Sequence, residues 1–208
     1  MDIIDSLKQL RLVPIVALPS VDAGLRLAEL LLAHDLPVME VTLRTEHGEA
    51  AMAEISERFR EILVIAGTVL SPHQVDRVVR CGARAIVSPG YSASLAAHCR
   101  GRDIAFFPGV CTPGEVQQVR EAGLRKLKFF PAAICGGTKM LGLFRAVYPD
   151  VAFMPTGGIN QENLLDYLAC DNVLCCGGTW LSPEAMMAEG RWDEIESRIS
   201  GALRILGA

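Results

Sequence analysis

The sequence predicts an α/β fold in which residues 1–208 form a single (β/α)8 TIM barrel with a short N-terminal helix. Short apolar runs typical of strands alternate with amphipathic helical segments from end to end. There are eight such alternations, and 208 residues is close to the lower limit for a closed (β/α)8 barrel. The competing architecture is a doubly wound open sheet, but no G-x-G-x-x-G motif follows the first apolar run. The barrel is therefore the better prediction.

The expected strands are about five or six residues long and rich in Val, Ile, Leu and Phe, as strands buried on both faces should be. Gly or Pro marks most junctions between strands and helices. The eight strands are predicted to begin near Leu12, Pro37, Leu63, Ala85, Ile104, Arg125, Val151 and Asn172.

The expected helices carry apolar residues at spacings of three and four. Representative segments are DAGLRLAELLLAHD (22–35), EAAMAEISERFREI (49–62) and PGEVQQVREAGL (113–124). Ser71-Pro72 and Thr112-Pro113 each place a capping residue before a first-turn proline, so two further helix starts are expected there. The N-terminal MDIIDSLKQL predicts a helix covering the barrel bottom, and the segment after Pro183 supplies the closing helices.

Charge and hydropathy exclude several classes of partner. The formal net charge is -4, so the surface as a whole does not attract nucleic acid or anionic lipid. The N-terminus carries acids where a signal peptide would carry basic residues, and no apolar run is long enough to span a membrane. We therefore expect a cytoplasmic protein without nucleic-acid or membrane partners.

The cysteines and histidines do not form a recognisable metal or disulfide pattern. The seven cysteines are an odd number without a C-x-x-C pair, and several lie in apolar runs, as reduced core cysteines do. A redox role for adjacent Cys175 and Cys176 is the alternative, although in an extended strand their side chains point to opposite faces. The four histidines lack ligand-like spacing. No metal site is predicted.

Polar residues cluster at the carboxyl ends of the predicted strands, which converge on the mouth of a (β/α)8 barrel where active sites lie. Those expected at the mouth are Glu40, Thr42, Arg44, Thr68, Ser88, Lys128, Thr156, Gly157, Gly158, Gly177, Gly178 and Thr179.

Lys128 is the most informative of these residues because it lies in the apolar segment KLKFFPA. Burial disfavours an ammonium ion relative to the neutral amine, and the neutral amine is the form that attacks a ketone. The alternative is that the side chain only reaches to the barrel rim to keep its charge in water. Lys126 shares the strand face but lies nearer the strand start, away from the mouth.

Glu40 lies within the second predicted strand, and Arg44 follows it by four residues, just after the strand. Glu40 interrupts the apolar run PVMEVTL, and near Lys128 it could be a structural ion-pair partner or a general acid/base. The planar guanidinium of Arg44 suits bidentate capture of a carboxylate, with a solvated loop arginine as the alternative. Thr68 could add a hydroxyl to the same carboxylate.

Two glycine pairs, Gly157-Gly158 and Gly177-Gly178, close the last two predicted strands. Barrels often bind phosphate at this position through backbone N–H groups. Glycines are also common in tight turns, so a purely structural role is the alternative.

Together these residues resemble the 2-keto-3-deoxy-6-phosphogluconate (KDPG) aldolase family, also called 4-hydroxy-2-oxoglutarate aldolase. The matching segments occur in the family's order over almost the whole chain. They are EVTLRT (40–45), AGTVL (66–70), SPG (88–90), PGV (108–110), KFFPA (128–132), PTGGI (155–159) and GGTWL (177–181).

The resemblance implies a class I aldolase that cleaves KDPG to pyruvate and glyceraldehyde 3-phosphate, and also 4-hydroxy-2-oxoglutarate to pyruvate and glyoxylate. It implies a homotrimer without metal or cofactor. Lys128 would form the Schiff base and Glu40 would move protons. Substrate would be held by Arg44 and Thr68 at the carboxylate, by Pro89 and Phe130 in the pocket, and by Gly157, Gly158, Gly178 and Thr179 at the phosphate.

This chain departs from the family pattern at two positions, with Thr179 where the family commonly has Ser, and Ala133 where an acid often follows KFFPA. Three alternatives stay open at the sequence level. They are an aldolase for the epimeric 2-keto-3-deoxy-6-phosphogalactonate, a phosphate-binding barrel isomerase that uses Glu40 without covalent catalysis, and a barrel that only binds.

Overall fold

The computed structural model describes residues 2–207, in which strands and helices alternate along the chain. The strands are β1 (Leu12–Val16), β2 (Val38–Thr42), β3 (Leu63–Gly67), β4 (Ala85–Val87), β5 (Ala105–Phe107), β6 (Gly109–Val110), β7 (Lys126–Phe129), β8 (Ala152–Pro155) and β9 (Cys176–Gly178). The helices are α1 (Ile3–Leu10), α2 (Val21–Ala33), α3 (Gly48–Arg58), α4 (Pro72–Arg80), α5 (Ala93–Gly101), α6 (Pro113–Glu121), α7 (Gly137–Val147), α8 (Leu164–Leu168), α9 (Glu184–Ala188) and α10 (Trp192–Leu206).

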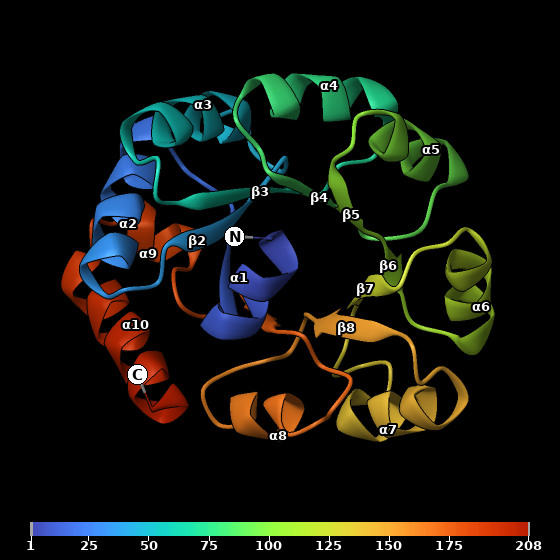
Figure 1. The fold of residues 1–208 in the computed structure, drawn as a ribbon. Coiled ribbons are helices and arrows are strands. Elements are labelled where there is room, and N and C mark those ends of the chain that lie inside the picture. Colours follow the sequence, from blue (N-terminus) through green and yellow to red (C-terminus); the bar gives the residue numbers. More distant parts are fainter. Residues whose placement is uncertain (1, 208) are drawn as a thin grey trace.

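The strands lie inside a ring of helices, and α1 lies over one open end of the strands (Figure 1). Six parallel strands form one sheet in the order β5-β4-β3-β2-β1-β9, and β6-β7-β8 form a second parallel sheet. Two isolated bridges, Phe153 to Val173 and Thr156 to Gly177, join β8 to the chain that enters and forms β9. The arrangement confirms the predicted (β/α)8 barrel, including the helix that covers its bottom.

The fifth predicted strand is divided because Pro108 lies between β5 and β6. Proline cannot donate a ladder hydrogen bond, which favours an interruption at this residue, although Pro14 is accommodated within β1. Its carbonyl still accepts a hydrogen bond from the backbone N–H of Lys128 at 2.9 Å, which keeps β7 beside the broken strand. The eighth predicted strand is shorter than expected, because continuous pairing starts at Cys176 rather than near Asn172.

The helix predictions hold, and the caps explain where two helices begin. Ser71 and Thr112 each accept a hydrogen bond from the third residue of their helix, and each forms a full capping box.

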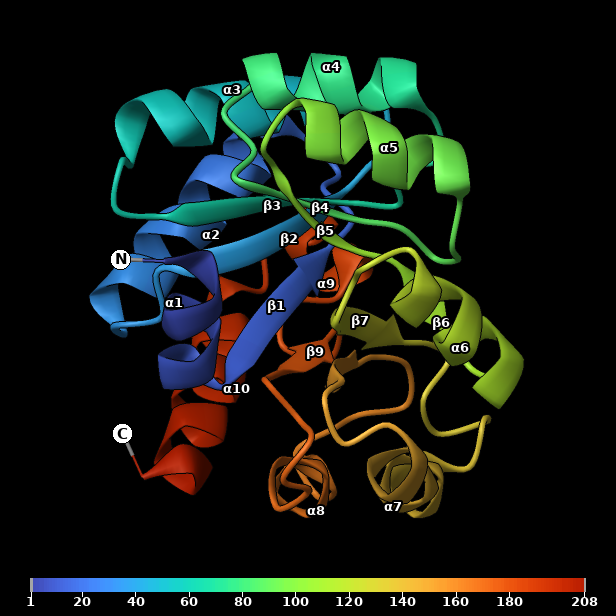
Figure 2. The ribbon, with the colours of Figure 1, turned by 45° about the vertical axis from the view of Figure 1, so that its right-hand side comes forward.

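Side chains from the helices and outer strand faces fill two apolar cores. The larger core lies mainly around β1–β5 and α2–α5, and the smaller lies around β6–β8 and α6–α8. In the smaller core the Phe144 ring packs edge-on against Phe129 and stacks on Phe153. Figure 2 shows the two groups of strands side by side.

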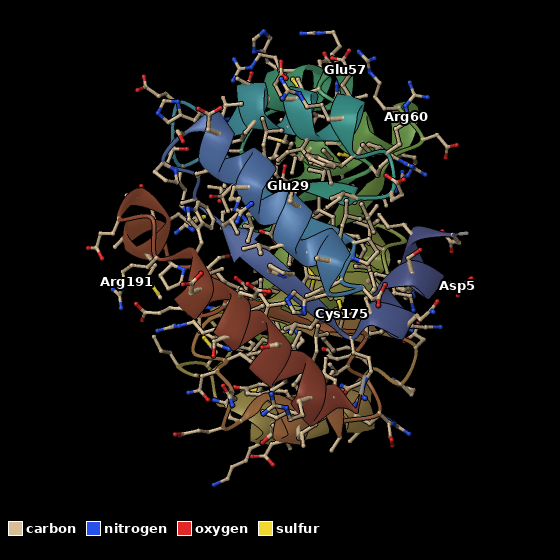
Figure 3. All side chains as sticks on the ribbon, turned by 90° about the vertical axis from the view of Figure 1, so that its left-hand side faces the viewer. Asp5, Glu29, Glu57, Arg60, Cys175 and Arg191 are labelled. Carbon is tan, nitrogen blue, oxygen red and sulfur yellow. The ribbon has the colours of Figure 1, made fainter. Side chains whose placement is uncertain are left out.

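Most charged side chains lie at the surface, and three of the seven cysteines, Cys99, Cys175 and Cys176, are buried. Figure 3 shows Asp5, Glu57, Arg60 and Arg191 at the periphery, whereas Cys175 lies among the packed elements. Within residues 2–207, no helix combines the length and apolar character needed to cross a membrane.

Candidate active site

Lys128 on β7 and Glu40 on β2 meet inside the barrel, although the two strands belong to different sheets. The Nζ atom of Lys128 donates a hydrogen bond to Oε1 of Glu40 at 3.1 Å. Their side chains are 8% and 0% exposed, so Lys128 does not extend to the solvent at the rim. The pair is a buried ion pair, in which each charge compensates the other.

The backbone around Glu40 is built to accept its carboxylate. Glu40 pairs in register with Ile15 on one side and Ile65 on the other, which fixes its side chain toward the interior. Gly67 lies two residues past Ile65 on the same face, and a Cβ atom at this position would overlap Oε1 of Glu40. Glycine at position 67 therefore leaves the space that the carboxylate occupies.

Two buried oxygen atoms, one of them on the Lys128 partner Glu40, have no hydrogen-bond partner among the described residues. They are Oε2 of Glu40 and Oγ1 of Thr156. Because unpaired buried polar atoms are rare and costly, they indicate positions where a bound molecule completes the hydrogen bonds. Sequence reasoning placed Thr156 at the mouth but gave it no role.

The pair opens into a pocket of about 190 Å³ at the carboxyl ends of the strands. Its lining consists of Ile15, Glu40, Thr42, Arg44, Thr68, Pro89, Lys128, Phe130, Thr156 and Thr179. The structure thus brings together seven of the ten predicted site residues. Lys126 lies elsewhere, in a different hollow beside Arg145 and Asp150.

Arg44 lies at the pocket edge and is oriented by a chain of two hydrogen bonds. Its Nε–H donates to Oγ1 of Thr42 at 3.2 Å, and the Thr42 hydroxyl donates to the carbonyl of Val16 at 2.8 Å. No described residue pairs with the terminal guanidinium nitrogens. The guanidinium group is therefore held in place, and its terminal nitrogens are available to bind an anion.

Thr68 is held in the left-handed region, with φ at 60°. A β-branched residue avoids this conformation, and such strain costs on the order of 1–3 kcal/mol. Strain of this kind persists where the surrounding structure imposes it, commonly at ligand sites. Here it occurs at Thr68 in the lining of the pocket that also contains Lys128.

The aromatic side chain of Phe130 and the ring of Pro89 complete the pocket wall. The Phe130 ring lies beside the amine, with Lys128 Nζ 5.5 Å from the ring centroid. Pro89 lines the wall from the loop after β4. Both predicted wall residues therefore adjoin the Lys128 amine pocket.

The three predicted phosphate glycines lie outside this lining, and each has a packing reason to be glycine. Gly157 and Gly158 have φ values of 95° and 81°, and a Cβ at Gly158 would overlap the Cβ of Ala133. A Cβ at Gly178 would overlap the indole ring of Trp180. None of the residues in the described chain accepts a hydrogen bond from the backbone N–H of Gly157, Gly158 or Thr179. These N–H groups are suitable donors for an anion.

The remaining nucleophilic and metal-binding candidates are not arranged for chemistry. Cys175 and Cys176 are both buried, in different cores, and burial raises the pKa of each thiol. A raised pKa disfavours the reactive thiolate. In the part of the chain that the structure describes, no group of three or more His, Cys, Asp or Glu could hold a metal ion.

Comparison with known proteins identifies the family of this chain. The family model described as KDPG and KHG aldolase matches residues 3–198. The chain is 36% identical over 205 residues to the 2-dehydro-3-deoxy-phosphogluconate aldolase of Treponema pallidum, covering 99% of this chain and 98% of that protein. It is 38% identical over 183 residues to the KHG/KDPG aldolase of Escherichia coli K12, covering 88% and 86%.

A solved structure of KDPG aldolase from Legionella pneumophila, with pyruvate captured as a covalent carbinolamine intermediate, is also similar. It superposes with a TM-score of 0.90 at 36% identity, covering 95% of this chain and 97% of that one. The family match over nearly the whole chain and the high identity to several relatives lead to one conclusion. This chain belongs to the KDPG and KHG aldolase family.

Proposed function

We propose that this protein is a class I aldolase that cleaves KDPG to pyruvate and glyceraldehyde 3-phosphate through a Schiff base on Lys128. The observation that carries the proposal is the buried Lys128–Glu40 pair at the base of the mouth pocket. The Glu40 carboxylate beside the Lys128 nitrogen is placed to take a proton from it when substrate binds. The nitrogen can then attack the ketone.

The first half of the reaction joins substrate to Lys128. The amine attacks the C2 carbonyl, and Glu40 carries protons from nitrogen to the C2 oxygen, which leaves as water. The product is a protonated imine at C2. Glu40 suits this work because Oε1 contacts the amine and Oε2 has no partner within the described chain.

The second half breaks the C3–C4 bond. Glu40 takes the proton of the C4 hydroxyl, the C4 oxygen forms the aldehyde carbonyl, and the bonding electrons move into the imine to give an enamine. Protonation at C3 and addition of water then release pyruvate and restore Lys128. Thr156 lines the same pocket as Lys128 and its hydroxyl has no partner among the described residues, so we assign it a contact with the C4 oxygen.

The pocket supports binding of the keto-acid end of the substrate. About 190 Å³ is below the roughly 300 Å³ that larger ligands need, so the pocket suits the pyruvyl group and leaves the rest at the mouth. We assign the carboxylate to Arg44 and Thr68, with Pro89 and Phe130 as walls. The same pocket would accept 4-hydroxy-2-oxoglutarate, releasing pyruvate and glyoxylate.

We assign the phosphate to backbone N–H groups of Gly157, Gly158, Gly178 and Thr179, at the ends of β8 and β9. The N–H groups at positions 157, 158 and 179, which lack acceptors in the described chain, support this assignment. The methyl group of Thr179 adds bulk beside the phosphate. The chemistry needs neither metal nor cofactor, because a protonated imine itself accepts the electrons.

We further propose a cytoplasmic homotrimer. The exposed apolar side chains of Leu143 and Val147 on α7 offer a surface that another copy would cover. Light scattering after gel filtration tests the assembly, with a mass three times that of the chain as the expected result.

The decisive experiment is borohydride reduction in the presence of pyruvate, followed by peptide mass mapping. A reduced pyruvyl adduct on Lys128 is expected. Lys128→Met should abolish both the adduct and KDPG cleavage, whereas an isomerase that uses only Glu40 would keep its activity. An adduct on Lys126, or none, would contradict the mechanism. Turnover of KDPG compared with its galactonate epimer then tests the substrate assignment, because a preference for the epimer would overturn it.

A further inference from the structure

Thr42 is the last residue of β2, and its side chain links Arg44 to the backbone of β1. The side chain is buried, at 2% exposure. Its hydroxyl donates to the carbonyl of Val16 at 2.8 Å and accepts the Nε–H of Arg44 at 3.2 Å. Val16 pairs in register with Val41, so the hydroxyl joins two neighbouring strands of the larger sheet. Arg44 is therefore attached to sheet backbone through a single hydroxyl group.

This hydrogen bond restrains a side chain that has little else to hold it. Arg44 lies in the turn after β2 and is exposed, and the Thr42 hydroxyl is the only hydrogen-bond partner of its guanidinium among residues 2–207. The backbone before it is anchored, because the N–H of Leu43 donates to the carbonyl of Gly67 at 2.9 Å. The freedom that remains lies in the arginine side chain. A ligand must order such a side chain when it binds, and a contact made in advance removes part of that entropic cost.

Arg44 also borders two hollows, so the direction of its side chain matters. One is the Lys128 pocket, which Thr42 lines as well. The other lies between the end of β1 and the loop before α9, and its lining includes Glu184 but not Thr42. The Glu184 carboxylate attracts a guanidinium that is free to turn toward it. The hydrogen bond to Thr42 therefore keeps Arg44 at the Lys128 pocket.

The Thr42 hydroxyl has no hydrogen left to donate to a substrate. A hydroxyl has one hydrogen, and that of Thr42 goes to the carbonyl of Val16. A carboxylate only accepts hydrogen bonds, so it gains nothing from the lone pairs that remain on this oxygen. The polar contribution of Thr42 to keto-acid binding must therefore pass through Arg44.

We infer that Thr42 is a positioning residue, which holds Arg44 for the substrate carboxylate and so determines how tightly the pocket binds 2-keto acids. The inference rests on the proposed Schiff-base function, in which Arg44 receives that carboxylate. The carboxylate takes no part in the bonds made and broken at C2, C3 and C4, so Arg44 holds it equally in the ground state and in the transition state. Loss of the Thr42 hydroxyl should then raise KM and leave kcat nearly unchanged.

The test measures KM and kcat for KDPG cleavage in Thr42→Val, which keeps the shape of the side chain and removes the hydroxyl. We expect KM to rise about tenfold, the effect of one lost hydrogen bond, with kcat nearly unchanged. The pyruvate concentration that gives half-maximal borohydride trapping on Lys128 should rise by the same factor. Thr42→Ser, which keeps the hydroxyl, should restore both values. Thr42→Ala repeats the test in a variant where water can reach the Val16 carbonyl.

Two further variants separate positioning from a general loss of structure. Arg44→Lys has no Nε–H, so adding Thr42→Val to it should raise KM no further. Asn172→Leu is the matched control, because the buried side-chain amide of Asn172 also donates to a backbone carbonyl, that of Leu141, at 2.9 Å. Asn172 does not line the Lys128 pocket, so this variant should leave KM for KDPG unchanged.

Three results would overturn the inference. They are an unchanged KM in Thr42→Val, a fall in kcat as large as the rise in KM, and a rise in KM as large in the Arg44→Lys background as in the wild type. A wild-type protein that neither cleaves KDPG nor forms the pyruvate adduct would instead refute the proposed function.

Discussion

Replacing Lys128 by Met should destabilise the protein strongly, because it leaves the Glu40 carboxylate buried without its partner. Glu40 is fully buried and its only described partner is the Lys128 amine at 3.1 Å. Removing one member of a buried pair costs about 3–5 kcal/mol. For a chain of this size each kcal/mol lowers Tm by roughly 2–4 °C, so a decrease of about 6–20 °C is expected.

The assay is thermal unfolding followed by circular dichroism near neutral pH. Lys126→Met is the control, because Lys126 lies on the same strand but lines a separate hollow. The double variant Lys128→Met with Glu40→Gln removes both charges and should recover most of the lost stability. The reasoning is refuted if Lys128→Met melts like Lys126→Met, or if the double variant is less stable than Lys128→Met alone.

Two further predictions follow from the same geometry. Gly67→Ala should abolish most aldolase activity while Tm stays above that of Lys128→Met, because the new Cβ displaces the Glu40 carboxylate from the amine; an unchanged kcat would contradict this reading. The second concerns pH: the hydrogen bond from His98 lowers the pKa of Asp76 from its ordinary value of 3.8. The stability from this contact is present above the unfolded pKa and is lost as pH falls through the lower native value. The Tm difference between wild type and His98→Ala should therefore be present at about pH 5 and shrink below about pH 4. A difference that stays constant to about pH 2.5 would be inconsistent with it.

Site residues were most predictable from the sequence where an ionisable residue lies within an apolar strand. Lys128 and Glu40 stand out because an ionisable group inside an apolar strand is costly, and the structure shows that they compensate each other. The strand positions were also predictable, since a strand buried on both faces has few alternatives. The break at Pro108 was less predictable, because a proline in a strand run does not always interrupt the strand, as Pro14 within β1 shows.

Features that depend on distant packing were not predictable. The requirement for glycine at position 178 comes from the Trp180 ring, and that at position 67 from the Glu40 side chain on another strand. The hydrogen bonds that orient Arg44 run through Thr42 to Val16 on a neighbouring strand.

The Lys128–Glu40 contact also has a mechanical consequence. β2 packs with the larger apolar core and β7 with the smaller one, so this ion pair ties the two halves of the barrel across the interior. If the smaller half separated transiently from the larger, the Lys128 amine would leave the Glu40 carboxylate before either half lost its own packing. Under the proposed mechanism, turnover would therefore report cooperativity between the halves and would be sensitive to partial opening that spectroscopic measures of secondary structure miss.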